Sequence, residues 1–319
     1  MNKQDKILIY FPVGLQTPEL EIMASKAQLA INDKSEVIIA RCAGTQNYAC
    51  SYNIWSRPEI CKVCQNQVDR ALDAIDGNFS QTYTPRKIEN FKLFDFENYK
   101  NLKKFKKDKV DFGQAVYSSY ISSTRDLELH GFIASRAISY LMNTSVTLYD
   151  WFSELLDREQ FSKIILYNGR QNNYRPVLRL AQKRNISCEV MEFSGQNNDC
   201  VYQFNNNLPQ EFLLLGRMIN ESWECQKDFL YKLSVADYYY NFKKSGGNIN
   251  DVRSYTAEQK KGKMPERWSI NKTNIVIFNS SEDEFAALGG PYDRGIYDSQ
   301  KEGISKIVND LSFDHDLQI

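Results

Sequence analysis

The N-terminal part of the chain alternates apolar runs with helical segments. Residues 6–11 (KILIYF) predict a buried strand, and residues 35–41 (SEVIIAR) predict a second one. Between them, Thr17–Ala30 begins with Thr-Pro-Glu, which is typical of a helix start. Strand, helix and strand in this order indicate a βαβ unit of a parallel sheet.

The same pattern returns after a long helical stretch. Residues 125–156 carry apolar residues at helical spacing, which predicts a helix facing the core. Residues 163–167 (KIILY) and 186–193 then predict two more strands, with a helix between them that ends near residue 184. With a further helical region at 210–243, these elements predict one complete Rossmann-like parallel-sheet domain over residues 1–245.

The remaining chain predicts the opening of a second domain. Residues 246–272 lack periodicity and contain Gly, Lys and Ser, so we interpret them as a linker. Residues 273–319 contain a strand pattern at 274–278 and a helix pattern at 299–311. A Rossmann-like domain is much longer than this segment. We therefore expect an α/β chain in which the C-terminal domain is incomplete.

Composition narrows the class of protein. The 319 residues are 42% hydrophobic and 13% aromatic, as in a globular protein, and the formal net charge is zero (40 Lys+Arg against 40 Asp+Glu). The balanced charge argues against a nucleic-acid partner. The sequence has no run of about 20 apolar residues that could span a membrane and no secretory signal pattern. We expect a cytoplasmic protein.

Four of the seven cysteines, Cys42, Cys50, Cys61 and Cys64, lie within one short segment. In a reducing compartment, disulfides are a poor explanation for such a cluster. The Cys61-x-x-Cys64 spacing lets two thiolates bind one ion from a single turn, so the segment predicts a closed structural zinc site. The alternatives are an iron–sulfur cluster, reduced thiols that pack a loop, and a redox pair.

Polar residues directly follow the predicted strand 274–278. A loop in this position lies at the carboxyl edge of a parallel sheet, where α/β proteins bind ligands. Ser280 and Ser281 offer hydroxyl and backbone N–H groups to an anion such as a diphosphate. The alternative is a serine cap over the acidic first turn of a helix at 282–284.

This segment also carries a family resemblance. Residues 274–287 (NIVIFNSSEDEFAA), followed by Tyr-Asp-Ser-Gln at 297–300, resemble the second-domain opening of bacterial capsule polysaccharide biosynthesis proteins, which are similar to GT-B glycosyltransferases. The four-cysteine loop is similar to one near the N-terminus of such proteins. Other positions that match the family pattern are Gly113, Ser118, Ser119, Arg125, Asn168, Gly169, Arg170 and Arg175.

The resemblance implies a GT-B-like fold and transfer of a sugar from a nucleotide-activated donor to a glycan or lipid-linked glycan acceptor. This transfer takes place at the inner face of the cytoplasmic membrane, in contact with the polysaccharide assembly machinery. The first domain binds the acceptor and the second the donor. The nucleotide sugar is a co-substrate, and nothing points to a catalytic metal. The substrate-binding candidates are Gly14, Ser118, Ser119, Asn168, Arg170 and Arg175, with Ser280 and Ser281 at the donor phosphate.

Sugar transfer needs a base for the acceptor hydroxyl and cationic groups for anionic partners. Glu192, at the end of the strand 186–193, is the candidate base, and Arg170 is the candidate clamp for a phosphate or carboxylate. Gly14 would let a substrate approach the first loop closely. Structural salt bridges are the alternative for Glu192 and Arg170. The competing functions are a non-catalytic or truncated acceptor-binding half and a metal- or redox-binding module.

Overall fold

The computed structural model describes residues 5–44, 49–85, 87–193, 201–245, 260, 262–293 and 295–319. The chain divides into two compact units: Met1–Ser194 with Asn198–Leu215, and Gly195–Asn197 with Gly216–Ile319. The division falls within α7 (Phe212–Cys225), whereas we expected the domain boundary after residue 245. Most of the predicted linker, namely residues 246–259 and 261, lies outside the described residues.

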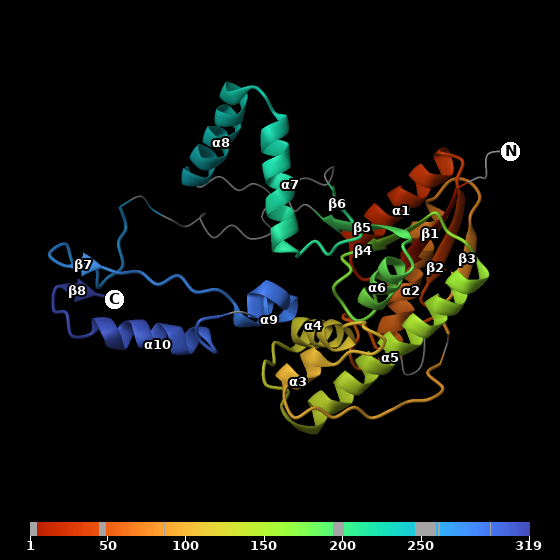
Figure 1. Cartoon of the computed structure of the whole chain (residues 1–319), viewed down its shortest axis with the longest axis horizontal. Helices are drawn as coiled ribbons and strands as arrows, with labels where there is room; N and C mark the ends of the chain where they lie inside the picture. The colour runs from red at the N-terminus through yellow and green to blue at the C-terminus, as the bar shows by residue number, and fades with distance from the viewer. Residues whose placement is uncertain are drawn as a thin grey trace. The chain divides into compact units, whose positions relative to one another are not determined.

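The first unit is built on a six-stranded sheet with the order β3-β2-β1-β4-β5-β6 (Figure 1). Its strands are β1 (Lys6–Phe11), β2 (Glu36–Arg41), β3 (Ser80–Tyr83), β4 (Lys163–Tyr167), β5 (Ser187–Phe193) and β6 (Val201–Asn205). The first five strands pair in parallel, and β6 pairs antiparallel with β5. This confirms the α/β class and the mostly parallel, Rossmann-like sheet. The edge strands β3 and β6 were not predicted, because neither carries a continuous apolar run: β3 is polar except for Tyr83, and Gln203 interrupts the apolar residues of β6.

Helices cover both faces of this sheet. They are α1 (Thr17–Asn32), α2 (Pro58–Asp73), α3 (Tyr99–Lys104), α4 (Phe112–Thr124), α5 (Gly131–Arg158) and α6 (Arg175–Lys183). The strand register places Ile9, Ile165 and Glu189 on one face, and Glu189 pairs there with Lys26 of α1. The ring of Tyr10, on the opposite face, contacts Phe152 of α5 at 4.8 Å between centroids. The sheet is therefore wound on both sides.

The core lies between the central strands and these helices. Four residues of the central strands are 0% exposed: Leu8, Ile9, Ile39 and Ile164. The continuous apolar runs predict this for strands that are buried on both faces. Each such side chain contributes about 1.5–3 kcal/mol of burial free energy relative to exposure. The apolar runs at 6–11 and 163–167 therefore mark β1 and β4 with their observed bounds.

Gly14 lies where the loop after β1 meets helix α2. Its N–H donates a hydrogen bond to Cys64 Sγ at 2.9 Å. A Cβ at this position would lie 2.3 Å from the Cys64 carbonyl oxygen and 2.7 Å from Val68 Cγ2, which is closer than real contacts allow. The close approach of helix α2 by itself explains a glycine at this position, and the substrate role of Gly14 stays a prediction.

In its described residues, the second unit contains helical segments and one short parallel strand pair. Its elements are most of α7, α8 (Phe229–Lys244), β7 (Thr273–Asn274), α9 (Glu282–Leu288), the 3-10 helix η1 (Gly290–Asp293), α10 (Gln300–Leu311) and β8 (Leu317–Gln318). Thr273 pairs with Leu317 and Asn274 with Gln318 in parallel. The strand predicted over 274–278 is limited to its first residue, because β8 offers a partner to only two residues; Phe278 is 92% exposed.

Substitution of Gly14 by alanine should destabilise the first unit by about 1–3 kcal/mol, because the added methyl group has no space against α2. Chemical denaturation measures this change. Gly216→Ala is the matched control: nothing lies within 4 Å of a Cβ there, so stability should be unchanged or rise by up to about 1 kcal/mol. Equal effects of the two substitutions would contradict the packing role of Gly14.

Candidate functional site

The order of the sheet defines where a ligand site belongs. Strands β1 and β4 are neighbours, but α1 lies on the Glu189 face of the sheet, whereas α6 packs with α5 on the opposite, Tyr10 face. Parallel α/β sheets bind ligands in the crevice that opens at such a switch point, at the carboxyl ends of the strands. In this structure, Tyr174 at the start of α6 donates its hydroxyl hydrogen bond to Glu19 at the start of α1. The two helix starts therefore meet at the switch point.

Glu192 lies at the end of β5, beside this point. Its Oε1 accepts a hydrogen bond from the Tyr167 hydroxyl at 3.2 Å, and its Oε2 accepts one from Asn168 Nδ2 at 2.6 Å. Burial raises the pKa of Glu192, and these two hydrogen bonds and the charge of Arg170 oppose the rise. The structure thus holds the candidate base in a fixed orientation, with a pKa above the ordinary value for glutamate.

Glu19 is a second carboxyl group at this site, and the sequence analysis treated it only as an acidic residue at a helix start. It is 1% exposed. Burial raises its pKa to about 8, the Tyr174 hydrogen bond opposes the rise, and the negative charge of Glu192 adds to it. Glu19 therefore carries a proton at neutral pH. Its contact with Tyr174 spans 155 positions, so no local sequence signal identifies it.

Tyr52, which lies in the cysteine segment, is close enough to Glu19 and Glu192 to interact with them electrostatically. Burial raises the pKa of its phenol, and the charges of Glu19 and Glu192 raise it further, while Arg170 lowers it. The phenol therefore lies within electrostatic reach of all three groups. We call Glu19, Glu192, Tyr52, Tyr167, Tyr174, Asn168 and Arg170 the carboxyl-pair site.

The turn after β4 has the conformation that the sequence suggested. Asn168 and Gly169 both have positive φ, 56° and 73°, and Asn168 Oδ1 accepts a hydrogen bond from the Arg170 backbone N–H at 3.2 Å. The Arg170 side chain is partly exposed and acts electrostatically on Glu192. The structure therefore brings together three predicted site residues, Asn168, Arg170 and Glu192.

Three other predicted substrate contacts lie beneath the surface. Ser118 and Ser119 are fully buried, and the Ser119 hydroxyl exchanges hydrogen bonds with Asn172. Arg175 is 3% exposed, with Nη1 3.5 Å from the Asp111 carboxylate. Burial alone would raise the pKa of Asp111, but Arg175 and its neighbour Arg179 lower it to about 2. Ser119 and Arg175 thus hold the β4–α6 loop and the start of α6 to α4, and burial leaves none of the three side chains open to a substrate in this structure.

The four cysteines of the 42–64 segment line one pocket at the carboxyl ends of β1 and β2. Burial raises the pKa values of the Cys42, Cys50 and Cys64 thiols, that of Cys64 to about 12, and the six cysteines that the structure describes are free. Within the described ranges, no three His, Cys, Asp or Glu side chains already stand in an arrangement that fits a metal ion. The four cysteines therefore line one pocket, and the zinc site stays a prediction.

Ser280 and Ser281 have partners within the second unit. The Ser280 N–H donates to Gln300 Oε1 at 2.9 Å, and the Ser280 carbonyl accepts from Gln300 Nε2 at 2.7 Å. Ser281 precedes α9, and its hydroxyl donates to Asp283 at 2.7 Å. The acidic residues do form a first helical turn, as the alternative interpretation expected, although the Ser281 side chain does not cap the helix backbone. The phosphate role of both serines stays a prediction.

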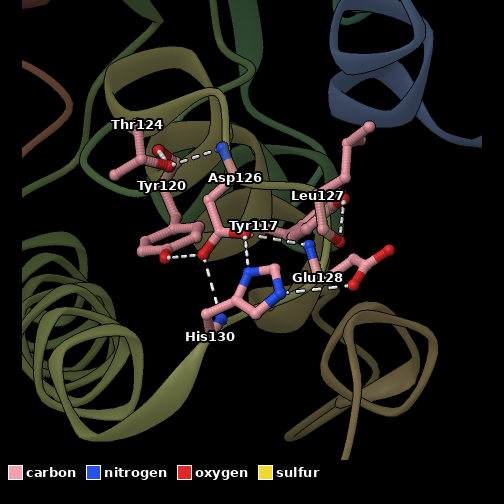
Figure 2. Close-up of polar contacts among 7 residues, drawn as sticks. All are labelled: Tyr117, Tyr120, Thr124, Asp126, Leu127, Glu128 and His130. Carbon is pink, nitrogen blue, oxygen red and sulfur yellow. Dashed lines mark hydrogen bonds and ion pairs between the residues drawn. The ribbon is translucent and has the colours of Figure 1, made fainter.

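A separate polar cluster stabilises the turn between α4 and α5 (Figure 2). Asp126 accepts hydrogen bonds from the Tyr120 hydroxyl at 2.6 Å and from the backbone and ring nitrogens of His130 at 3.0 and 2.9 Å. The His130 side chain is 74% exposed and also approaches Glu128. The two carboxylates raise the pKa of His130, chiefly through the hydrogen bond to Asp126. His130 is thus a surface histidine that orders this turn.

Comparisons with known proteins show a distant structural likeness for this chain. No family model and no curated protein matches the sequence. A solved structure described as a CDPS from Fluoribacter dumoffii has a TM-score of 0.36 and 13% sequence identity, over 63% of this chain and 90% of that one. So distant a likeness carries no argument about function. In the ranges that the structure describes, none of the helices combines the length and apolar character needed to cross a bilayer.

The buried Glu19 should make stability depend on pH. Its pKa rises from an ordinary value of 4.5 to about 8 on folding, so between these values the folded state binds more protons than the unfolded state. Stability contributed by this group is therefore lost as the pH rises, on the order of 3 kcal/mol between pH 5 and pH 8. Urea denaturation at these two pH values measures the effect.

Glu19→Gln should remove this dependence, because an amide still accepts the Tyr174 hydrogen bond and cannot ionise. The variant should resemble the wild type at pH 5 and exceed it in stability at pH 8. Glu21→Gln, an exposed position on the same helix, is the control. A Glu19→Gln variant whose stability differs from wild type by the same amount at both pH values contradicts the assignment.

Proposed function

We propose that the chain is a glycosyltransferase-type protein of capsule or other surface-polysaccharide biosynthesis, with a GT-B-like arrangement in which the first unit binds the acceptor. The observation that carries the proposal is the carboxyl-pair site. It combines a fixed carboxylate of raised pKa with an arginine at the switch point of a parallel sheet. The family resemblance of residues 274–287 supplies the reaction class.

Glu192 serves as the base. It accepts the proton of the acceptor hydroxyl as that oxygen attacks the anomeric carbon of the donor sugar. The bond from this carbon to the donor phosphate breaks, and the leaving nucleotide keeps the electron pair. A pKa raised above the ordinary value of glutamate suits a group that must take up this proton, and Tyr167 and Asn168 hold its oxygens in place through hydrogen bonds.

Glu19 supports this role by staying neutral. Two carboxylates in a partly buried site repel each other, so one of them retains its proton. Glu19 is the more deeply buried of the two, and its pKa is about 8. Of the two, Glu192 is therefore the group that more readily loses its proton and can accept one from the acceptor.

Arg170 binds the anionic part of the acceptor. Glycan carboxylates and the phosphates of lipid-linked carriers are planar or tetrahedral oxyanions that a guanidinium group can bind through two parallel hydrogen bonds. Arg170 is partly exposed beside Glu192, so an acceptor bound there presents a hydroxyl to the base. The second unit binds the nucleotide-sugar donor, with Ser280 and Ser281 near its phosphates, and the protein works at the inner face of the membrane beside the assembly machinery.

Arg170→Ala should weaken binding of an anionic glycan or lipid-linked acceptor by more than about 1.5 kcal/mol, the low end for a hydrogen bond to a charged group. The melting temperature should change less than for a core substitution. Titration calorimetry and thermal melts on the same sample measure both. Arg136→Ala, at an exposed arginine on α5, is the control. Unchanged affinity together with a clearly lowered melting temperature indicates a structural salt bridge instead.

Glu192→Gln should abolish transfer, with a loss of roughly 10²–10⁴ in rate, while acceptor affinity is retained. Transfer from a radiolabelled nucleotide sugar measures the rate, and calorimetry measures the affinity. If wild type binds the acceptor but transfers nothing, the protein is the non-catalytic acceptor-binding half. If Glu192→Gln transfers at the wild-type rate, Glu192 is not the base.

A further inference from the structure

We infer that the pocket lined by Asn173 at the carboxyl ends of β1 and β2 binds a small, uncharged molecule that has an apolar body and one amide group. The Asn173 side chain pairs with that amide through two hydrogen bonds. The inference stands on the pocket and on Asn173, and it goes beyond the proposed sugar transfer, which does not use this pocket.

Asn173 is a buried polar side chain in the pocket wall. It is 2% exposed, and neither its Nδ2 nor its Oδ1 has a hydrogen-bond partner among the described residues. A buried amide in this state lowers the stability of the fold, so it needs an explanation in a native structure. A ligand that brings one acceptor and one donor satisfies both atoms.

The neighbours of Asn173 in the β4–α6 loop each have a side-chain hydrogen bond within the protein. Gln171 accepts one at 2.6 Å, and Asn172 donates to two backbone carbonyls at 3.0 and 3.2 Å. Tyr174 donates to Glu19. Asn173 is therefore the exception in a loop whose other side chains fix its conformation, which favours a role towards a ligand over loose packing.

The rest of the described pocket wall is mostly apolar. Side chains from β1, the loop after it, α2 and α5 line the pocket: Phe11, Leu15, Ile60, Val68 and Leu148. Burial raises the pKa values of the Cys42, Cys50 and Cys64 thiols, so these three groups in the wall are neutral at pH 7. A neutral, apolar wall favours an apolar ligand body.

Arg41 is the one charged side chain among the described residues of the wall. Its Nη1 lies 2.6 Å from the Asp69 carboxylate, so its charge is already paired. These residues therefore offer neither a free cation to an anionic ligand nor a carboxylate to a cationic one. An amide is an uncharged group with a donor and an acceptor in one plane, which matches the two unpaired atoms of Asn173.

The pocket adjoins the carboxyl-pair site. Tyr10 lines the pocket, and the centroid of its ring lies 6.0 Å from that of Tyr174. The charge of Glu19 also reaches the Cys64 thiol in the pocket wall and raises its pKa. A molecule held by Asn173 therefore lies beside the buried Glu19 carboxyl group.

The experiment compares three small molecules of similar shape by NMR titration of the full chain at pH 7: isobutyramide, methyl isopropyl ketone and isobutyrate. Isobutyramide offers a donor and an acceptor, the ketone offers only an acceptor, and isobutyrate is charged. We expect saturable binding of isobutyramide, roughly tenfold weaker binding of the ketone and no binding of isobutyrate.

Asn173→Leu should weaken isobutyramide binding by about tenfold or more, because the two hydrogen bonds are lost. The melting temperature should equal or exceed that of the wild type, since leucine has a similar size and leaves no polar atom unpaired. Asn66→Leu, at an exposed asparagine on α2, is the control and should bind isobutyramide as the wild type does.

Thiol labelling of the wild type provides a second measurement that needs no variant. Saturating isobutyramide should slow the reaction of iodoacetamide with Cys50 and Cys64, which line the pocket. The reaction of the exposed Cys225 should not change. Mass spectrometry resolves the individual cysteines.

Each result decides the inference. Isobutyramide binding that weakens in Asn173→Leu and slows the labelling of Cys50 and Cys64 supports it. A wild type that does not bind isobutyramide, equal binding of isobutyrate, unchanged affinity in Asn173→Leu, or binding without slower labelling of these cysteines overturns it. Transfer activity does not enter these readouts, so the proposed function can fail while the pocket assignment holds, and the reverse.

Discussion

Two carboxyl groups lie at the point where the order of the sheet reverses, and burial makes a second negative charge there costly. Glu19 keeps its proton at neutral pH and accepts a hydrogen bond from the Tyr174 hydroxyl. Burial also raises the pKa of Glu192, whose carboxylate oxygens accept hydrogen bonds from Tyr167 and Asn168. The two carboxyl groups differ because of their positions in the fold. Glu19 lies at the start of α1 beside the start of α6, whereas Glu192 lies at the end of β5.

The loops around the site are fixed by a buried polar network. The Asn172 side chain donates to the Ala49 and Leu141 carbonyls, and Ser119 and Ser145 bond to the same residue. Buried amides of this kind are expensive unless every group has a partner, so the network specifies one arrangement of the loops. It joins the β4–α6 loop, the cysteine segment and helices α4 and α5, and so positions Tyr52 and Arg170.

Much of the fold followed from sequence, because buried parallel strands are continuous apolar runs; residues 6–11 and 163–167 mark β1 and β4. The polar edge strand β3 carries no such signal. The sequence predicted Asn168, Arg170 and Glu192 as site residues, because the ends of apolar strands can be recognised from the local sequence. Glu19 was missed and Ser119 misassigned, since burial and a partner 155 positions away depend on tertiary packing that no local pattern records.

The central claim is that Glu19 is protonated at neutral pH. It can be tested by NMR titration of the intact chain labelled with ¹³C at the glutamate carboxyls, with Glu19→Gln and Glu192→Gln to assign the two signals. The account predicts one glutamate signal that titrates near pH 8 and disappears in Glu19→Gln. A Glu19 signal that titrates together with the surface glutamates would contradict it.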